Sequence, residues 1–414
     1  MEKFPHIHTV DASAGSGKTY KLALRYTILV LSSKSSCIKE ILAITFTNKA
    51  AKEMKARILL WLKKIALDEL EEKEKDLLKK SIGEDFFQIK KRAYQVLEEI
   101  INHYDYFQVN TIDSFMNVIV NASSFYLGLS PYFKIEEDYS FYLEKALDEL
   151  IRNAGHNKDL KKIFERFLWH YLEIENQASW FPKRNILRLF STLFTHSNLR
   201  GKNFTQLWKD EGIKESAEEI KCYLEEISCL NLSKRFLKSI LNAKKETPLK
   251  ALTKLANYFD KENEELSKDK KFPQVWKEFK EKVKLFCESF SLSRFNPYIE
   301  IFYEFLNIFE ELKRQKDILF LEELNKKVKE ITRSVFYPQY VYQYLALKFN
   351  HYLIDEFQDT SRLQWENLKP LIEEALSCGG SLFYVGDRKQ SIYRFRAADV
   401  GLFDEVKKEF KEKV

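Results

Sequence analysis

Two short segments combine residue types that could hold phosphate groups and activate a water molecule. The first reads ASAGSGKT and lies between an apolar run and an amphipathic stretch. Small residues let backbone N–H groups converge on phosphate oxygens, while Lys18 can reach the β- and γ-phosphates and Thr19 can offer its hydroxyl to Mg²⁺. A chance glycine turn before a helix is the weaker alternative, because the strand–loop–helix context is intact. The predicted nucleotide-binding residues of this loop are Ala12, Ser13, Ala14, Gly15, Ser16, Gly17, Lys18 and Thr19.

The second segment, Tyr352–Thr360, reads YLIDEFQDT and is an apolar run that ends in two adjacent carboxylates. At the carboxyl edge of a parallel sheet, Asp355 could hold Mg²⁺ through water, and Glu356 could orient and deprotonate an attacking water. Adjacent carboxylates are costly to bury without a cation, which argues against a purely structural role. An exposed loop that carries these residues by accident is the alternative, and the neighbouring phosphate-binding loop weakens it.

A third segment, Tyr384–Asp399, reads YVGDRKQSIYRFRAAD and follows another strand-like run. Gln390 would lie on the same sheet edge, where its amide could bond the γ-phosphate and lose that bond after hydrolysis. Next to it come aromatic and arginine side chains that could stack on bases and contact phosphates of a single strand. These are Tyr393, Phe395 and Arg396. On composition alone, a helix that buries the two rings in the core is an equally good alternative.

If these segments form one site, each should follow a strand that ends at the same edge of a sheet. Short β-rich runs stop at small polar loops at both ends of the chain, and each is followed by a helical pattern. The runs are HIHTVDAS, EILAITFT, YFQVNTI, HYLID and SLFYVGD. Strands that alternate with helices predict an α/β fold with a parallel sheet covered on both faces.

The middle of the chain has a different pattern. No glycine occurs between Gly212 and Gly379, and apolar residues recur there at three- and four-residue spacings. This pattern predicts amphipathic helices packed on one another. We therefore predict one α/β domain in two pieces, with a large all-α domain inserted between them. The predicted boundaries are 1–138 for the first α/β segment, 139–319 for the helical insertion and 320–414 for the second α/β segment.

Composition permits nucleic-acid binding without demonstrating it. The net charge of +6 is a weak excess for 414 residues. The five cysteines form no CxxC pair, so we expect reduced thiols and no zinc or iron–sulfur site. The N-terminus is not a signal peptide, and no apolar run reaches membrane-spanning length. We therefore expect a cytoplasmic protein without a membrane partner.

The ordered segments resemble the motifs of superfamily 1 DNA helicases of the UvrD/Rep class, and most closely those of RecB and AddA helicase–nuclease subunits. The ASAGSGKT loop resembles motif I, LIDEFQDT resembles motif II, and GDRKQSIYRFRAAD resembles motif III. AITFTNKAAKEMKARI (Ala43–Ile58) is similar to motif Ia, and NTIDSF (Asn110–Phe115) is similar to motif Ib. The helical middle carries no motif, so its resemblance is architectural only.

The resemblance implies a RecA-like P-loop domain that uses ATP and Mg²⁺. It implies catalytic roles for Lys18, Glu356 and Gln390, metal binding by Thr19 and Asp355, and a contact of Arg25 with the nucleotide base. The strand ILAIT also ends in polar side chains at a helix N-terminus, which suits a phosphate, and a helix cap by Thr47 or Asn48 is compatible with that role. The implied DNA-binding residues are Thr45, Phe46, Thr47, Asn48, Thr111, Ser114, Tyr393, Phe395 and Arg396.

The chain departs from the family pattern at several points. Asp113 stands where motif Ib usually has histidine, so an anion faces the presumed DNA path. Ala397 replaces the usual glycine of motif III, which would stiffen the turn. Motifs IV to VI and a nuclease domain have no counterpart in the sequence. We therefore expect a piece of a longer protein, with weak activity or none by itself.

The expected function is that of an ATP-dependent DNA helicase or translocase. It would act on single-stranded and duplex DNA in recombination and double-strand break repair, together with an AddB/RecC-like partner subunit. Two alternatives stay open. One is a degenerate helicase kept as a DNA-binding scaffold, against which the intact Lys18, Asp355, Glu356 and Gln390 argue. The other is a P-loop ATPase that remodels RNA or protein, against which motif Ia and the aromatic run of motif III argue.

Overall fold

The computed structural model describes residues 7–11, 17–32, 38–169, 183–205, 210–293, 295–332, 337–345, 348–391, 393 and 396–411. The contacts divide the chain into two compact units. We call the first the sheet unit, which comprises Met1–Tyr139, Ser191–Asn203 and Lys313–Val414. We call the second the helical unit, which comprises Ser140–Phe190 and Phe204–Leu312.

Both ends of the chain contribute strands to one parallel sheet. Its five strands are β1 (Ile7–Asp11), β2 (Ile41–Thr45), β3 (Val109–Thr111), β6 (His351–Ile354) and β7 (Ser381–Gly386). They are ordered β1-β7-β6-β2-β3, and every pair is parallel. Asp11 pairs with Gly386, and Thr45 pairs with Thr111, so the strands end together at one edge. The predicted α/β fold with a parallel sheet is confirmed.

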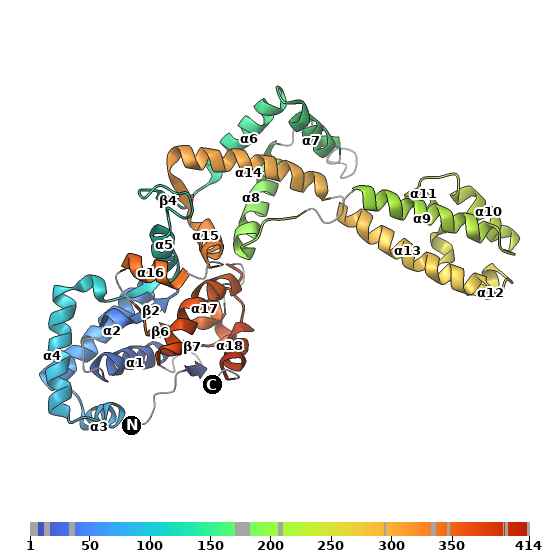
Figure 1. Cartoon of the computed structure of the whole chain (residues 1–414). Coiled ribbons are helices and arrows are strands. Elements are labelled where there is room, and N and C mark those ends of the chain that lie inside the picture. Colours follow the sequence, from blue (N-terminus) through green and yellow to red (C-terminus); the bar gives the residue numbers. More distant parts are fainter. Residues whose placement is uncertain are drawn as a thin grey trace. The chain divides into compact units, whose positions relative to one another are not determined.

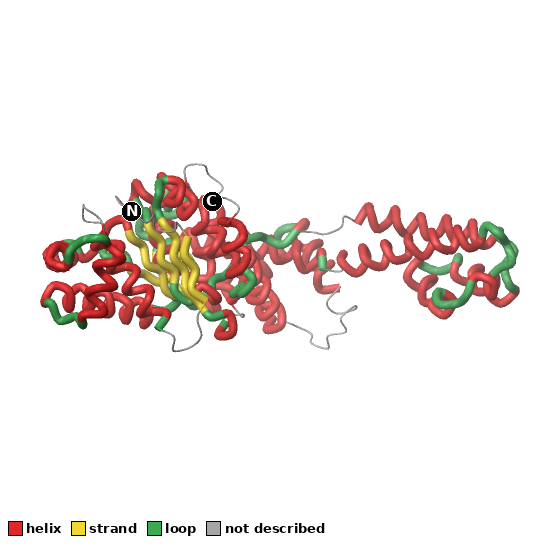
Figure 2. Tube along the Cα trace, turned by 90° about the horizontal axis from the view of Figure 1, so that it is seen from below, coloured by secondary structure: helices red, strands yellow, loops and turns green. Residues whose placement is uncertain are grey.

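Helices cover both faces of this sheet, as its strand sequences require. Within β7, Leu382 and Tyr384 pack into one core, while Phe383 and Val385 pack into the other. A strand that alternates between two apolar faces must be covered on both sides. Figure 2 shows the strands with helices on either side.

One face carries helices from the first part of the chain, and the other face carries helices mostly from its last part (Figure 1). The first set is α1 (Lys18–Ser32), α2 (Asn48–Leu67), α3 (Glu72–Ile82) and α4 (Phe86–Asn102). The second set is α5 (Ile112–Ala122), α15 (Leu324–Ile331), α16 (Tyr337–Leu345), α17 (Arg362–Ser377) and α18 (Leu402–Lys411). Short 3-10 helices in this unit are η1 (Ile38–Glu40), η2 (Tyr104–Tyr106), η5 (Leu321–Glu323), η6 (Phe357–Asp359) and η7 (Arg388–Gln390).

The sheet unit also contains a small second sheet and the end of a helix from the chain's middle. Strands β4 (Lys134–Glu136) and β5 (Ile318–Phe320) form a parallel pair. The hydroxyl of Thr195 lies 3.0 Å from the Tyr139 hydroxyl and donates to Glu322 at 3.0 Å. The sequence-based division placed residues 191–203 in the helical insertion, whereas in the structure they pack within the sheet unit.

In the described residues of the helical unit, every regular element is a helix. They are α6 (Ser140–Ala154), α7 (Lys158–Trp169), α8 (Lys183–Arg200, up to Phe190), α9 (Asp210–Ser228), α10 (Lys234–Ala243), α11 (Pro248–Leu255), η4 (Ala256–Tyr258), α12 (Asn263–Leu266), α13 (Phe272–Ser293) and α14 (Asn296–Lys316, up to Leu312). Stacked and edge-on aromatic rings, including Phe236, Trp276 and Phe279, fill the core shared by α9, α10, α11, α12 and α13. Among the helices of the described residues, none combines the length and apolar character needed to cross a membrane.

Candidate functional site

The start of α1 lies at the carboxyl edge of the sheet. Gly17 has a φ of +76°, which is in the left-handed region that favours glycine. Its carbonyl accepts a hydrogen bond from the N–H of Lys21 at 2.9 Å, so the helix begins directly after this turn. The structure therefore supports a loop-to-helix transition at Gly17 and Lys18. Ala12, Ser13, Ala14, Gly15 and Ser16 lie outside the described residues, and their roles stay predictions.

Three predicted catalytic side chains meet at one ammonium group. Lys18 is 7% exposed, and its Nζ lies 3.4 Å from Oε2 of Glu356 and 3.3 Å from Oε1 of Gln390. These partners stand 338 and 372 positions away in the sequence. A lysine ammonium is a compact point charge with three donors, so it can exchange such partners for phosphate oxygens. The arrangement can therefore bind a polyphosphate between the lysine and the amide of Gln390.

Asp355 is a buried carboxyl beside Thr19. It is 4% exposed, and burial, followed by the charge of Glu356, raises its pKa to about 6. The backbone N–H of Glu356, the charge of Lys18 and the hydroxyl of Thr19 act in the opposite direction. A divalent cation at this position would favour the charged carboxylate. Thr19 and Asp355, the two predicted metal ligands, therefore lie together in a site that fits Mg²⁺.

The protein would supply few ligands to such a cation. Within the described residues, no group of three or more His, Cys, Asp or Glu side chains could hold a metal ion. Mg²⁺ commonly keeps several waters and uses one or two carboxylates together with substrate phosphates. The hydroxyl and carboxylate present here agree with that kind of site.

Glu356 has a strained backbone at the edge of the sheet. Its φ is +47°, which is unusual for a residue with a side chain, and its N–H donates to Oδ1 of Asp355 at 3.0 Å. Its carboxylate also accepts a hydrogen bond of 2.8 Å from Gln358. The sequence motifs gave Gln358 no role, although its place within the DEFQD segment was visible.

Arg25 lies farther along α1 than the phosphate-site residues. Its guanidinium carbon is 5.9 Å from the ring centre of Phe383, which stacks on His8. Burial lowers the pKa of Arg25. Phe383 and His8 lie in the first half of their strands and not at the carboxyl ends, near which Lys18 lies. The structure thus places Arg25 apart from the Lys18 cluster, and its contact with a nucleotide base stays a prediction.

Aromatic side chains from two of the predicted motifs lie together near the end of β2. The ring centroids of Phe46 and Tyr393 are 4.2 Å apart, and both side chains are half-buried. The exposed Arg396 places its guanidinium carbon 5.8 Å from the Phe46 ring centre. Rings and a guanidinium can stack on bases and contact phosphates. Phe395 lies outside the described residues, so its predicted role is unchanged.

The polar residues next to Phe46 form hydrogen bonds within the turn between β2 and α2, and some of them are also exposed. Thr45 is buried, and its hydroxyl donates to the carbonyl of Thr47 at 3.2 Å. Thr47 is the N-cap of α2 and accepts a hydrogen bond from the N–H of Ala50 at 3.1 Å, so the expected cap is confirmed. Asn48 is exposed as the first residue of the helix. Among these three, Thr47 and Asn48 reach the surface where a phosphate could approach.

The second predicted DNA segment is also built around a helix cap. Thr111 caps α5 by accepting from the N–H of Ser114 at 3.2 Å, and its hydroxyl donates to Oγ of Ser114 at 2.8 Å. Burial raises the pKa of Asp113, while the charge of Arg396 and a side-chain hydrogen bond with Gln364 act in the opposite direction. The anion of motif Ib therefore has partners within the protein.

A cavity of about 360 Å³ adjoins this surface. Its lining includes Phe46, Asp113 and Arg396, together with Glu322 and residues of the 191–203 segment. All of these residues belong to the sheet unit. The contribution of residues 191–203 was missed from the sequence, because no motif marks them.

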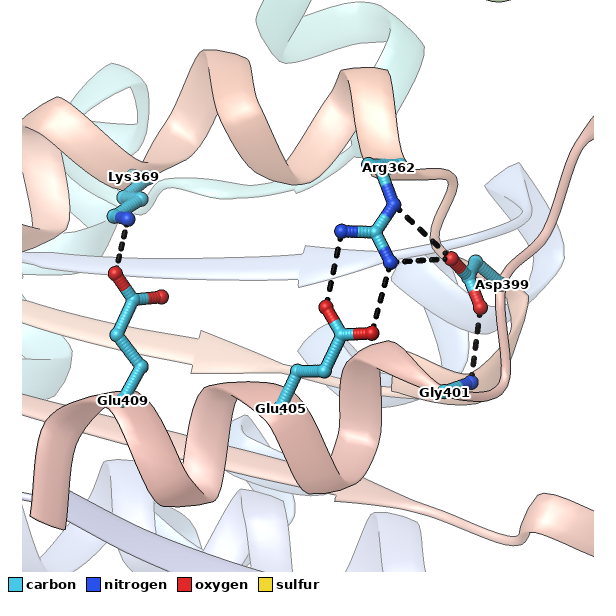
Figure 3. Close-up of polar contacts among 6 residues, drawn as sticks. All are labelled: Arg362, Lys369, Asp399, Gly401, Glu405 and Glu409. Carbon is cyan, nitrogen blue, oxygen red and sulfur yellow. Dashed lines mark hydrogen bonds and ion pairs between the residues drawn. The ribbon is translucent and has the colours of Figure 1, made fainter.

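Ion pairs hold the end of the motif III segment against α17 (Figure 3). Arg362 lies 2.9 Å from Asp399 and 3.0 Å from Glu405, and Asp399 also accepts from the N–H of Gly401 at 2.9 Å. Exposed ion pairs each contribute only about 0–1 kcal/mol, but a guanidinium shared by two carboxylates fixes orientation. Ala397, two residues before Asp399, has a φ of +61°. This left-handed backbone costs a non-glycine residue roughly 1–2 kcal/mol.

The fold and the site define a class of protein. The chain belongs to the UvrD/REP helicase N-terminal domain family, whose profile matches residues 2–411.

The chain is also similar to individual helicase and nuclease subunits. The chain is 28% identical to RecBCD enzyme subunit RecB of Buchnera aphidicola, over 95% of this chain and 34% of the relative. It is 26% identical to an ATP-dependent helicase/nuclease subunit of Streptococcus sanguinis, over 97% of this chain and 35% of the relative. It is 25% identical to exonuclease/helicase subunit RexA of Streptococcus pneumoniae, over 96% and 34%. The chain thus spans about a third of the length of these relatives.

Proposed function

We propose that this chain is the nucleotide-binding motor portion of an ATP-dependent DNA helicase or translocase. The observation that carries the proposal is the meeting of Lys18, Glu356 and Gln390 at one ammonium group. Membership of the UvrD/REP family supports the same assignment. A scaffold without activity has no need to keep the lysine, the carboxylate and the amide in mutual contact.

Each site residue has a distinct task in this proposal. Lys18 exchanges its contacts with Glu356 and Gln390 for the β- and γ-phosphates. Thr19 and Asp355 hold Mg²⁺, which when bound supplies positive charge against the phosphates. Glu356 accepts the proton of the attacking water, and Gln390 hydrogen-bonds the γ-phosphate.

The DNA contacts follow directly after the γ-phosphate contact in the sequence. Tyr393 is three residues beyond Gln390 and packs on Phe46. When hydrolysis removes the γ-phosphate contact of Gln390, the segment that follows Gln390 can move and carry the ring of Tyr393 with it. We assign the single strand to the surface formed by Phe46, Tyr393 and Arg396, with the exposed Thr47 and Asn48 beside it.

The biological setting is proposed from the relatives. One is named as belonging to the RecBCD enzyme, and others are named as helicase/nuclease or exonuclease/helicase subunits. We infer an action on single-stranded and duplex DNA in recombination and double-strand break repair, in the cytoplasm. An AddB/RecC-like partner subunit is part of this proposal.

Steady-state phosphate release by the intact protein that carries this chain tests the proposal. Single-stranded DNA should stimulate hydrolysis, and Lys18→Ala should remove the stimulated turnover. Lys21→Ala is the matched control, because Lys21 is an exposed lysine one turn along the same helix. Strand displacement from a fluorescent duplex should follow the same pattern.

Two other outcomes would contradict the proposal and favour one of the alternative functions. DNA binding without any nucleotide binding would indicate a scaffold. Hydrolysis stimulated by RNA or by a protein partner, and indifferent to DNA, would indicate a remodelling ATPase.

A further inference from the structure

A buried amide links the catalytic carboxylate to the motif III turn. Gln358, in η6, is 1% exposed. Its Nε2 donates to Oε2 of Glu356 at 2.8 Å, and its Oε1 accepts from the backbone N–H of Asp387 at 2.9 Å. Asp387 directly follows β7, so one side chain bridges two neighbouring strand ends. A buried amide that satisfies both of its ends rigidifies the groups it joins.

The orientation of this amide is fixed by chemistry. A backbone N–H can only donate, so the oxygen of Gln358 must face Asp387. The NH₂ group must then face Glu356, whose carboxylate oxygen is the acceptor. A flipped amide would place an oxygen against the carboxylate and an NH₂ against an N–H. Gln358 therefore presents a donor to Glu356.

The bridge closes a ring of contacts around the nucleotide site. From Asp387, the turn η7 runs to Gln390, whose N–H donates to the Asp387 carbonyl at 3.0 Å. Gln390 accepts from Lys18, and Lys18 lies 3.4 Å from the same Oε2 of Glu356 that Gln358 contacts. Both donors thus approach one oxygen.

Gly386 makes room for the bridge. A Cβ built on Gly386 would lie 2.4 Å from Oε1 of Gln358 and 3.1 Å from the ring of Phe403. The first distance is far inside van der Waals contact, and Gln358 is enclosed and cannot swing away freely. A glycine at this strand end is therefore required for the amide to reach Asp387.

We propose that Gln358 is a positioning residue that holds the Glu356 carboxylate in place for water activation and joins it to the Asp387–Gln390 turn. The inference rests on the proposed ATPase function. Because Gln358 bridges both groups, a movement of the Gln390 turn on loss of the γ-phosphate also shifts the donor at Glu356. In this role Gln358 acts through Glu356.

Two substitutions remove the bridge by different routes. Gln358→Met keeps the length of the side chain and removes the amide hydrogen bonds to Glu356, Asp359 and Asp387. Gly386→Ala instead pushes the intact amide out of place. In the intact protein, each should lower the DNA-stimulated kcat about 10- to 100-fold, the usual scale for a residue that orients a ligand or base through one contact. The affinity for a non-hydrolysable ATP analogue should stay within about twofold, because Lys18 and Thr19 are untouched.

The double variant separates positioning from general destabilisation. If both substitutions act on the same amide, the double variant is no slower than the worse single variant. Independent structural damage would instead multiply the two losses.

Matched controls come from the same unit. Asn367→Leu removes a fully buried amide that donates to the carbonyl of Asn325, and Gly401→Ala adds a methyl group near the side chain of Asp399. Both should keep kcat, even where Asn367→Leu lowers the unfolding temperature.

The outcomes distinguish this inference from the function on which it rests. Wild-type kcat in both Gln358→Met and Gly386→Ala, alongside an inactive Glu356→Gln, would overturn the positioning role and leave the ATPase assignment intact. Full activity of Glu356→Gln would overturn the assignment of the base itself. If Gln358→Met does not fold, Gly386→Ala still decides the question.

Discussion

We have proposed a nucleotide site around Lys18 and a DNA surface around Phe46, and we call these two regions of the sheet edge the nucleotide side and the DNA side. The two regions are built differently. On the nucleotide side, side chains from distant segments contact one another directly: Lys18 reaches both Glu356 and Gln390. On the DNA side, the hydroxyls of Thr47 and Thr111 are engaged in capping their own helices. The nucleotide side is thus a network of mutual contacts, whereas the DNA side is a set of locally stabilised turns that present two rings and an arginine.

This difference indicates where a substitution acts. In a mutual network, removing one member leaves buried charges or amides unpaired, so the effect is large and specific to catalysis. In a capped turn, removing a hydroxyl first weakens the helix, and ligand affinity changes less. Substitutions on the two sides can therefore be ordered from the largest expected effect to the smallest.

The largest loss of turnover is expected for substitution of Glu356, the proposed general base. Glu356→Gln should lower turnover of the intact protein by at least roughly 100-fold, the usual scale for a general base, because the amide cannot accept the proton of water. Binding of ATP and Mg²⁺ should persist, because Lys18, Thr19 and Asp355 remain. Single-turnover phosphate release measures the first expectation, and calorimetry with an ATP analogue measures the second. Surviving turnover would show that the water is activated elsewhere.

Asp355 should lower the stability of the nucleotide-free chain. Its folded pKa of about 6 exceeds the ordinary value of 3.8, so the folded state holds the proton more tightly. The free energy of unfolding should therefore fall as the pH rises from about 4 to about 6, and stay lower above that. Asp355→Asn, which cannot ionise, should be more stable at pH 7–8 by roughly 3 kcal/mol.

Denaturant unfolding of both proteins across this pH range measures the difference. It should shrink as the pH falls and vanish below about pH 3, where the carboxyl of Asp355 is protonated in both the folded and the unfolded state. A difference that does not depend on pH would mean that the substitution acts through packing instead of charge.

On the DNA side, we expect the rings of Phe46 and Tyr393 to contribute most to the affinity for single-stranded DNA. Phe46→Ala and Tyr393→Ala should each weaken binding of single-stranded DNA by about 1–3 kcal/mol, the scale of base–aromatic stacking, with little dependence on sequence. Fluorescence anisotropy with oligonucleotides of different sequence measures the loss, and circular dichroism checks the fold. If the variants unfold while their folded fraction binds normally, the rings serve packing and not DNA.

The smallest effect is expected at the cap of α2. Thr47→Ala should lower the free energy of unfolding by about 1 kcal/mol, because the N–H of Ala50 loses its partner. Asn48→Ala, at the exposed neighbouring position, is the control and should change stability less. A loss of DNA affinity in Thr47→Ala as large as that in Phe46→Ala would erase the distinction between the two sides.

The sequence was sufficient to predict the location of residues that come shortly after a strand. Lys18, Asp355 and Gln390 each come shortly after an apolar run, and parallel strands bring such ends to one edge. The α/β fold follows from the same alternation of runs and helical patterns. The common location of Phe46 and Tyr393 was implied by the family resemblance and not by the strand pattern, because β6 lies between β2 and β7 in the sheet.

Other features depended on contacts that no local pattern reveals. The bridge of Gln358 requires the amide to turn inward and Gly386 to lie opposite, 28 positions away in the numbering. Residues 191–203 have an ordinary helical pattern, yet they pack with the sheet unit because Thr195 meets Tyr139 and Glu322. Asp113 looked like an exposed anion until its place beside Gln364 and Arg396 was visible.

Nucleotide binding by Lys18→Ala tests the central claim most directly. If the contacts of Lys18 with Glu356 and Gln390 mark a phosphate site, calorimetry with a non-hydrolysable ATP analogue should show binding to the intact protein and to Lys21→Ala. The same measurement should show no binding to Lys18→Ala, because the phosphates lose their main cation. Equal affinity in Lys18→Ala and the wild type would contradict the account.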